Sequence, residues 1–261
     1  MGFTVQRCIL NRYSHKSPQQ QPRQDLAEII QTHLSAPWQR PIAAHSLEAF
    51  AAIRNRVETS TAPLIIDSCC GTGDSTRNLA AAFPEALVLG IDKSEHRLAR
   101  HRSGQLTSEQ TSRQTSRQTS QQTSQQNSGE ENYLMLRADV NDFWRLAAGA
   151  GWQPVQHFLL YPNPYPKASQ FRKRWYGSPA FPFLIKLGGR LTVRTNWAIY
   201  AQEFVQALAA VGLQASSRPL SEDKPITAFE TKYMQRGDSL FEVVSDLEDF
   251  VGFPTNSSAS F

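Results

Sequence analysis

Hydrophobic positions along the chain fall into two alternating patterns. Short apolar runs such as APLIID (62–67) and ALVLGID (86–92) predict buried strands. The segment between them, STRNLAAAF (75–83), has the apolar spacing of a helix. The same alternation continues downstream, with further strands predicted at 132–139, 155–162 and 189–195 and helices at 140–148, 178–187 and 197–211.

This alternation predicts an α/β fold. Strands that are apolar throughout are typical of a parallel sheet with helices on both faces. Ligands of such sheets bind beyond the carboxyl ends of the strands. Two helical patterns upstream, at 25–36 and 44–58, are expected to cover an edge of the sheet.

One segment does not fit a folded domain. Residues 103–131 repeat Thr-Ser-Xaa-Gln without any aromatic residue, so they bury too little apolar area to offset the entropy of ordering them. We predict a disordered insertion there. The chain then divides into a peripheral segment with covering helices (1–61), a main domain (62–250) and a frayed tail (251–261).

Composition narrows the class of protein. With 261 residues and 40% hydrophobic content, the chain can fill a core. It has no apolar run long enough for a membrane span, and its first residues lack the pattern of a signal peptide, so we expect a cytoplasmic protein that does not act at a membrane. Its three cysteines show no metal-ligand spacing, so no metal is expected. A net charge of +4 favours a polyanionic partner, and the sequence does not give the oligomeric state.

A glycine loop follows the first predicted strand. In DSCCGTGDST (67–76), Gly71 and Gly73 permit a tight turn and a close approach of a ligand to the backbone. Position 76 is a threonine, which disfavours the dinucleotide fingerprint and its third glycine. Asp92 ends the second strand, where a carboxylate can accept both hydroxyls of a ribose. With Asp139 at the end of the third strand, the pattern resembles the S-adenosylmethionine site of Rossmann-like methyltransferases, with an NAD site as the alternative.

The fourth strand runs into YPNPYPKASQFRKRW (161–175). Two prolines fix the backbone on either side of Asn163 and leave unpaired carbonyl acceptors, so this turn is rigid and polar. It is either a charged surface loop or the edge of an acceptor pocket beside a nucleic-acid phosphate. Basic and aromatic side chains are expected around this end of the sheet: Lys167, Arg172, Lys173, Arg174, Lys186, Arg190, Arg194, Lys232 and Arg236, with Tyr165, Phe171, Trp175, Tyr176 and Trp197.

Three segments resemble the bacterial tRNA (guanine-N7)-methyltransferase family. YPNPYPKASQFRKRW resembles its F-P-D-P-W-x-K signature, LGGRLTVRTNWAIYAQEF (187–204) its G-G…T-D-W…Y-A segment, and PITAFETKYMQRGDSLFEV (225–243) its T-x-F-E-x-R-G segment. With the cofactor loop, the likeness covers 62–102 and 132–245. It implies a class I methyltransferase fold with a largely parallel seven-stranded sheet. It also implies methyl transfer from S-adenosylmethionine to guanine N7 in tRNA, at position 46 of the variable loop.

The resemblance also implies roles for individual residues. Cofactor binding falls on Asp67, Gly71, Gly73, Asp92 and Asp139. Substrate binding falls on Lys167, Arg172, Thr227, Phe229 and Glu230, and the catalytic positions are Asn163 and Asn196. The chain departs from the family at several of its motif positions: Asn163 and Asn196 replace aspartates, Tyr165 replaces a tryptophan and Ala228 replaces a lysine.

The two asparagines, Asn163 and Asn196, determine whether efficient methyl transfer can be expected. Guanine N7 already carries a lone pair, so alignment of the reacting atoms is the main requirement. An aspartate adds a paired acceptor and negative charge near a ring that becomes cationic, whereas asparagine is neutral. Two alternatives therefore stay open. One is an amino-group methyltransferase, because NPYP resembles an N-P-P-Y motif. The other is a weakly active or noncatalytic relative that binds RNA or cofactor.

Overall fold

The structure, a computed structural model, describes residues 19–36, 38–100, 131–220 and 225–250. The tail predicted at 251–261 and the insertion predicted at 103–131, apart from Glu131, lie outside these residues. No described helix is both long and apolar enough to cross a bilayer.

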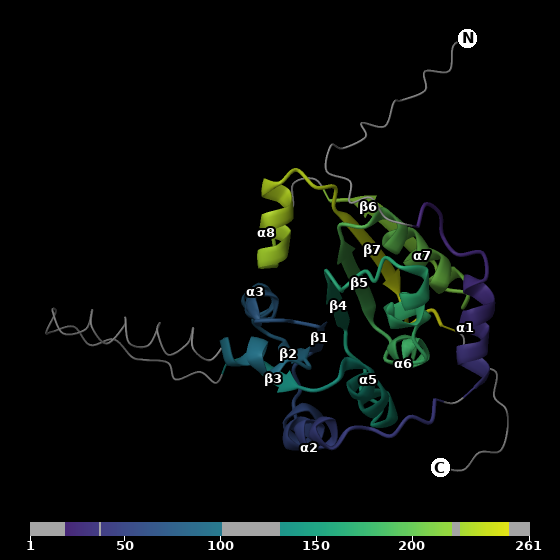
Figure 1. The fold of residues 1–261 in the computed structure, drawn as a ribbon. Coiled ribbons are helices and arrows are strands. Elements are labelled where there is room, and N and C mark those ends of the chain that lie inside the picture. Colours follow the sequence, from purple (N-terminus) through teal and green to yellow (C-terminus); the bar gives the residue numbers. More distant parts are fainter. Residues whose placement is uncertain (1–18, 37, 101–130, 221–224, 251–261) are drawn as a thin grey trace, which may run out of the picture.

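The described residues form one seven-stranded sheet with the strand order β3-β2-β1-β4-β5-β7-β6 (Figure 1). β1 to β5 are parallel, and β7 runs antiparallel to both of its neighbours. The predicted fold class, a largely parallel seven-stranded α/β sheet, is therefore confirmed. The strands are β1 (Leu64–Ser68), β2 (Leu87–Asp92), β3 (Tyr133–Arg137), β4 (Gln156–Leu160), β5 (Arg190–Thr195), β6 (Ala215–Pro219) and β7 (Phe241–Asp246).

Helices follow most of the strands, at the positions that the apolar spacing predicts. The helix expected at 178–187 is shorter, because the chain first makes a 3-10 turn and Pro182 then occupies the first turn of α6. Residues 95–100 are also helical. The remaining elements are α1 (Leu26–Ser35), α2 (Ala44–Glu58), α3 (Asp74–Ala82), α5 (Val140–Gly149), η1 (Ala168–Lys173), η2 (Trp175–Gly177), α6 (Phe181–Lys186), α7 (Ala198–Ala209) and α8 (Ala228–Gln235).

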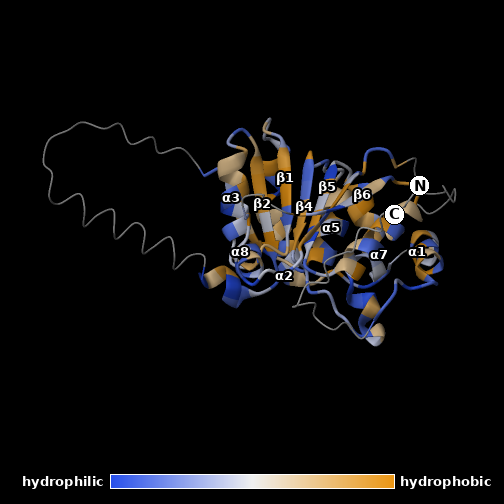
Figure 2. Cartoon of the chain, turned by 90° about the horizontal axis from the view of Figure 1, so that it is seen from above, coloured by the Kyte–Doolittle hydropathy of each residue, from blue (hydrophilic) through white to orange (hydrophobic). Residues whose placement is uncertain are grey.

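Helices cover both faces of the sheet. Alternate side chains of each strand point to opposite faces. Ile66, Leu89 and Leu159 belong to the larger core cluster, which α1, α2, α5, α6 and α7 complete. Ile65 and Val88 belong to a second cluster under α3. Figure 2 shows hydrophobic strands at the centre of the molecule, with hydrophilic residues on the helices around them.

Gly90 in β2 lets α3 lie close against the sheet. A Cβ atom at this position would stand 2.3 Å from Oγ1 of Thr76 and 2.8 Å from Sδ of Met135. Neither distance is possible for a real side chain, so only glycine fits. The close approach places the first turn of α3 directly against β2.

The first two helices belong to the same body as the sheet. α1 packs against α6 and α7, and α2 packs against α5 and β3. Phe50 of α2 stacks on Trp152, with ring centroids 4.6 Å apart. These contacts bury the apolar side of each helix, which explains their spacing in the sequence.

Candidate active site

The residues predicted to bind the cofactor lie at the carboxyl ends of β1, β2 and β3, and the two asparagines follow β4 and β5. The backbone N–H of Cys70 donates to the carbonyl of Ile91 (3.1 Å), and that of Gly71 donates to Oδ2 of Asp92 (3.1 Å). The glycine loop after β1 and the carboxylate that ends β2 are thus joined directly. These two features therefore meet at one edge of the sheet.

Asp92 is held firmly at this edge. Its side chain is 2% exposed, and its Oδ1 accepts from the backbone N–H of Ser94 (2.7 Å) and from Arg97 (2.8 Å). Together with the N–H of Gly71, these donors hold the buried carboxylate in one orientation. Asp92 can therefore present further lone pairs to hydroxyl donors of a ligand.

The glycine loop has left-handed backbone at every second residue. The φ angles are 65° at Cys69, 62° at Gly71 and 83° at Gly73. A Cβ atom at Gly71 would meet no atom within 4 Å, so protein does not fill the space over the loop. Cys69 is a residue that the sequence analysis missed. Its position two residues before Gly71, in the same alternating series, is the sequence feature that could have indicated it. A non-glycine residue at positive φ is strained, and such strained residues are common at functional sites.

Asp67 lies beneath this loop and is fully buried. Its Oδ2 accepts from the hydroxyls of Ser75 (2.6 Å) and Thr76 (2.7 Å), whereas its Oδ1 has no hydrogen-bond partner. Burial raises the pKa of Asp67 to about 6, against the hydrogen bonds from the two hydroxyls. A buried carboxylate with an oxygen that lacks a hydrogen-bond partner fits a ligand that carries an ammonium group.

We expect Asp67 to make the stability of the free protein depend on pH. The folded-state pKa of about 6 lies above the ordinary value of 3.8, so between these values the folded state binds more protons than the unfolded state. As the pH rises through this window, the free energy of unfolding of the wild type should fall by about 3 kcal/mol relative to Asp67→Asn. Urea denaturation of both proteins from pH 4 to pH 7 measures this. A difference that does not change with pH would contradict it.

Asp139 caps the helix that follows β3. Its Oδ1 accepts from the backbone N–H of Asn141 (2.9 Å) and from the Asn141 side chain (2.7 Å). Its Oδ2 makes only a long ion pair with Arg40 (3.7 Å). The backbone N–H of Ala138 donates to the carbonyl of Asp92 (3.2 Å), so Asp139 lies next to the end of β2.

The turn after β4 is strained at two tyrosines. Tyr161 has a φ of 50° and Tyr165 a φ of 46°. Asn163 is exposed, and its Oδ1 accepts from the backbone N–H of Tyr165 (3.2 Å). Bulky residues at positive φ persist only where the surroundings hold them, which favours a functional role for this turn.

The two asparagines follow neighbouring strands. The backbone N–H of Tyr161 donates to the carbonyl of Arg194 (2.8 Å), which continues the pairing of β4 with β5. Asn163 and Asn196 therefore extend from adjacent strand ends, beside the β1 loop. Asn196 is partly buried. Lys167 and Arg172 are exposed on the segment that follows the turn.

Several basic and aromatic residues do not lie where the sequence analysis put them. Arg174 and Arg194 are buried in ion pairs, so they are not free for phosphate, and Lys186 and Arg190 lie at the amino end of β5, on the opposite edge of the sheet. Phe171 and Tyr176 are core residues. The reason is the same in each case: the local sequence shows neither the distant partners of a side chain nor the end of the sheet at which it lies. The exposed basic residues that remain near the turn or on and beside α8 are Lys167, Arg172, Lys173, Lys232 and Arg236.

The T-x-F-E segment forms the start of α8. Thr227 caps the helix by accepting from the backbone N–H of Glu230 (3.0 Å), and Oε2 of Glu230 accepts from the N–H of Ile226 (2.8 Å). Oε1 of Glu230 pairs with Arg194 of β5 (2.7 Å). Thr227 and Glu230 thus fix α8 on the sheet. In Figure 1 α8 stands beside α3, and Asn78 of α3 donates to the carbonyl of Ile226 (2.8 Å).

α8 carries a short series of rings. Phe229 is 57% exposed and stacks on Tyr233, with ring centroids 6.3 Å apart. Tyr233 contacts Tyr161, with centroids 5.5 Å apart. The rings therefore lead from the surface of α8 to the turn that holds Asn163.

Two further features of the described residues do not add to this site. No group of histidine, cysteine and acidic residues with a geometry suited to a metal ion occurs in the described part of the chain. A groove of about 400 Å³ lies between α2 and α5, lined by residues such as Leu47, Phe50 and Arg145. Its lining contains none of the predicted site residues.

Comparison with known proteins identifies the family. A family model described as a putative methyltransferase matches residues 61–244. Two similar relatives, both named tRNA (guanine-N(7)-)-methyltransferase, come from Nocardia farcinica (30% identical over 202 residues, covering 70% of this chain and 66% of the relative) and Ectopseudomonas mendocina (25% over 234 residues, covering 85% and 86%). A third with the same name, from Rhodococcus jostii, is 34% identical over 92 residues, 33% of this chain and 36% of that relative. The chain thus spans less than two thirds of the Rhodococcus and Nocardia relatives that it matches.

One solved structure, described as an antibiotic-related methyltransferase, shares the fold. It is 12% identical, has a TM-score of 0.52, and covers 75% of this chain and 92% of its own. Because the family model matches most of the chain and the Nocardia relative matches at 30% identity, the chain belongs to the bacterial tRNA (guanine-N7)-methyltransferase family.

Proposed function

We propose that this chain transfers a methyl group from S-adenosylmethionine to N7 of a guanine in tRNA, at position 46 of the variable loop. The observation that carries the proposal is the direct bond between Gly71 and Asp92 at the edge where the β4 turn presents Asn163. Family membership supports the reaction and the substrate. A cytoplasmic location follows from tRNA as the substrate.

The cofactor fits the carboxylates of this edge. S-adenosylmethionine, when bound, supplies the methyl group from its sulfonium. Asp92 would accept the ribose hydroxyls, the free Oδ1 of Asp67 would face the ammonium group, and Oδ2 of Asp139 would accept from the adenine amine. Gly71 leaves room for close contact with the backbone, since a Cβ atom built there would meet no atom within 4 Å, and Gly73 supplies the positive φ of the same loop.

Asn163 would orient the guanine. The bond from the backbone N–H of Tyr165 uses one of the two lone pairs of its Oδ1 and orients the side chain, and its amide N–H groups can donate to a ligand. Guanine carries O6 next to N7, and both are acceptors. A donor to O6 would hold N7 toward the methyl group, and no base is needed because N7 has a lone pair. Asn196, from the neighbouring strand end, would contact the same base.

The same bond weakens the case for an amino-group acceptor. In that chemistry an asparagine oxygen and a proline carbonyl accept from the amine that is methylated. Here the bond within the turn already uses one of the two lone pairs of the asparagine oxygen. Together with the names of the relatives, this favours guanine N7, and amine methylation is an outcome of the test below.

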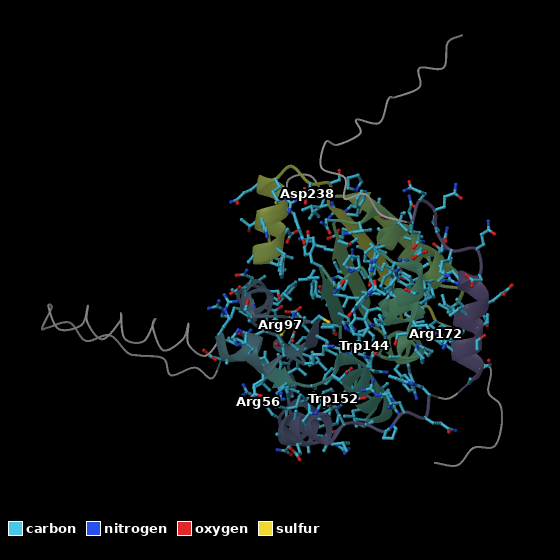
Figure 3. The ribbon with its side chains drawn as sticks, in the orientation of Figure 1. Arg56, Arg97, Trp144, Trp152, Arg172 and Asp238 are labelled. Carbon is cyan, nitrogen blue, oxygen red and sulfur yellow. The ribbon has the colours of Figure 1, made fainter. Side chains whose placement is uncertain are left out.

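The tRNA would be held by charge and by stacking. Lys167, Arg172 and Lys173 are exposed beyond the turn, and Lys173 lies over the ring of Tyr165 (5.8 Å). Phe229 offers an exposed ring of the kind on which unpaired bases stack. In Figure 3, Arg172 lies toward α1, whereas Arg97, which pairs with Asp92, lies on the side of β2 and α3.

Replacing Lys167 and Arg172 together by alanine should weaken tRNA binding and its salt dependence. Loss of two phosphate contacts makes the plot of log affinity against log salt concentration shallower by about 1.4–1.8. The double variant Lys186→Ala, Arg190→Ala is the matched control. It also removes one lysine and one arginine, but near the amino ends of the strands, at the opposite edge of the sheet. Binding titrations at several salt concentrations measure both slopes. If the two double variants change the slope equally, the RNA does not bind where we place it.

Methyl-labelled cofactor tests the function itself. The chain is incubated with the labelled cofactor and total tRNA, and the tRNA is digested to nucleosides and separated. Label in N7-methylguanosine, with aniline-sensitive strand cleavage at that nucleotide, is the expected result. Label in an amino group would replace this proposal by an amino-group methyltransferase. Binding of both ligands without any label would indicate a noncatalytic relative.

A further inference from the structure

Glu203 of α7 is a buried carboxylate with four donors. Its Oε2 accepts from Arg174 and from the hydroxyl of Tyr176 (2.6 Å). Its Oε1 accepts from the side chain of Gln19 (2.6 Å) and from the backbone N–H of Arg23 (2.9 Å). Its side chain is fully buried. It lies in α7, away from the strand ends, and the proposed function gives it no role.

Arg174 connects this carboxylate to the turn after β4. Its guanidinium is 3% exposed and pairs with Glu203 through Nη1. Its Nε and Nη2 both donate to the carbonyl of Tyr165 (3.1 and 3.0 Å), and Nη2 also donates to Oε1 of Gln19 (2.7 Å). A guanidinium used on all sides in this way is held in one orientation.

The carbonyl that Arg174 holds belongs to the strained residue. Tyr165 has a φ of 46°, and its own backbone N–H donates to Oδ1 of Asn163. Two donors on its carbonyl offset the cost of this conformation, because without them the peptide is free to relax. The conformation of Tyr165 in turn fixes which side of the Asn163 amide faces the ligand.

We propose that Glu203 is a positioning residue for Asn163, which acts through Arg174 and the backbone of Tyr165. The inference rests on the proposed function and goes beyond it, since Glu203 touches neither cofactor nor tRNA. Through Gln19 and Arg23, the segment before α1 is joined to the same carboxylate and braces the turn from outside the sheet.

Glu203→Gln tests the proposal, because it keeps the size of the side chain and removes the charge that holds Arg174. We expect kcat for methyl transfer to fall at least 10-fold while the affinity for S-adenosylmethionine is unchanged. Hydrogen exchange of the segment 161–174 should become faster. Asp142→Asn is the matched control: Asp142 is also fully buried and also accepts from an upstream backbone N–H, that of Ala43 (3.1 Å), but it does not contact Arg174 or Tyr165.

A double-mutant cycle separates positioning from general stability. In an Asn163→Ala background, Glu203→Gln should lower kcat much less than it does in the wild type, because the two act through one path. Full additivity of the two effects, or equal loss of kcat in Asp142→Asn, would overturn the proposal. If the wild type transferred no methyl group, the proposed function would fail. The hydrogen exchange of residues 161–174 would still test this inference, and an unchanged exchange rate in Glu203→Gln would refute it.

Discussion

Asp92→Ala is expected to weaken the binding of S-adenosylmethionine at least 100-fold. The substitution removes the carboxylate that we propose as the acceptor for the ribose hydroxyls, and hydrogen bonds to a charged group contribute about 1.5–3 kcal/mol each. It also frees the backbone N–H of Gly71, so the loop over the cofactor loses its link to β2. Isothermal titration calorimetry measures the affinity directly.

A nearby carboxylate serves as the control for Asp92. Glu95 is exposed and pairs only at the surface with Arg137 (3.1 Å), so Glu95→Ala should bind the cofactor as the wild type does. Asp92→Asn, which keeps one acceptor oxygen, should fall between the two. Equal affinity of Asp92→Ala and wild type, with both shown to be folded, would remove the cofactor site from this edge of the sheet.

Arg194→Met is expected to cost about 3–5 kcal/mol of the free energy of unfolding, the usual cost of breaking a buried ion pair from one side. Arg194 pairs with Glu230 (2.7 Å) and Glu242 (3.0 Å), and all three side chains are buried. Methionine would leave Glu230 as an uncompensated buried charge, since its other partner is only a backbone N–H. We therefore also expect α8 to lose its fixed position.

Arg54→Met is the matched control for this effect. Arg54 pairs with Glu58 (2.8 Å) one helical turn away on α2, and its side chain is 56% exposed. Exposed pairs of this kind contribute less than about 1 kcal/mol. Urea denaturation of both variants gives the comparison. A loss at Arg194 no larger than that at Arg54 would mean that the buried network does not hold α8.

The sequence predicts the five parallel strands well because they are buried on both faces. Strands β1 to β5 are buried between two layers of helices, so most of them read as continuous apolar runs. β6 has no such signal, because it is an edge strand with mostly exposed residues, ASSRP. The pattern of α8 is weakly amphipathic, and the helix depends on its cap at Thr227 and on Glu230 rather than on apolar spacing.

The site divides in the same way. Asp67 and Asp92 can be predicted as site residues because each lies at the end of an apolar run, which the local sequence shows. The burial of Arg174 does not, since its partner Glu203 lies 29 residues away in α7. A run such as FRKRW looks like a basic surface, although one of its arginines is a structural residue of the interior. Long-range pairing of charges was the missing information.

A structure of the chain with bound S-adenosylhomocysteine, which keeps the ribose and amino-acid groups of the cofactor, tests the central claim most directly. We predict ribose hydroxyls within hydrogen-bond distance of Asp92, the ammonium group toward Asp67, and the sulfur facing the turn that contains Asn163. Binding elsewhere, such as in the groove between α2 and α5, would contradict the account, and so would a ligand whose sulfur points away from Asn163.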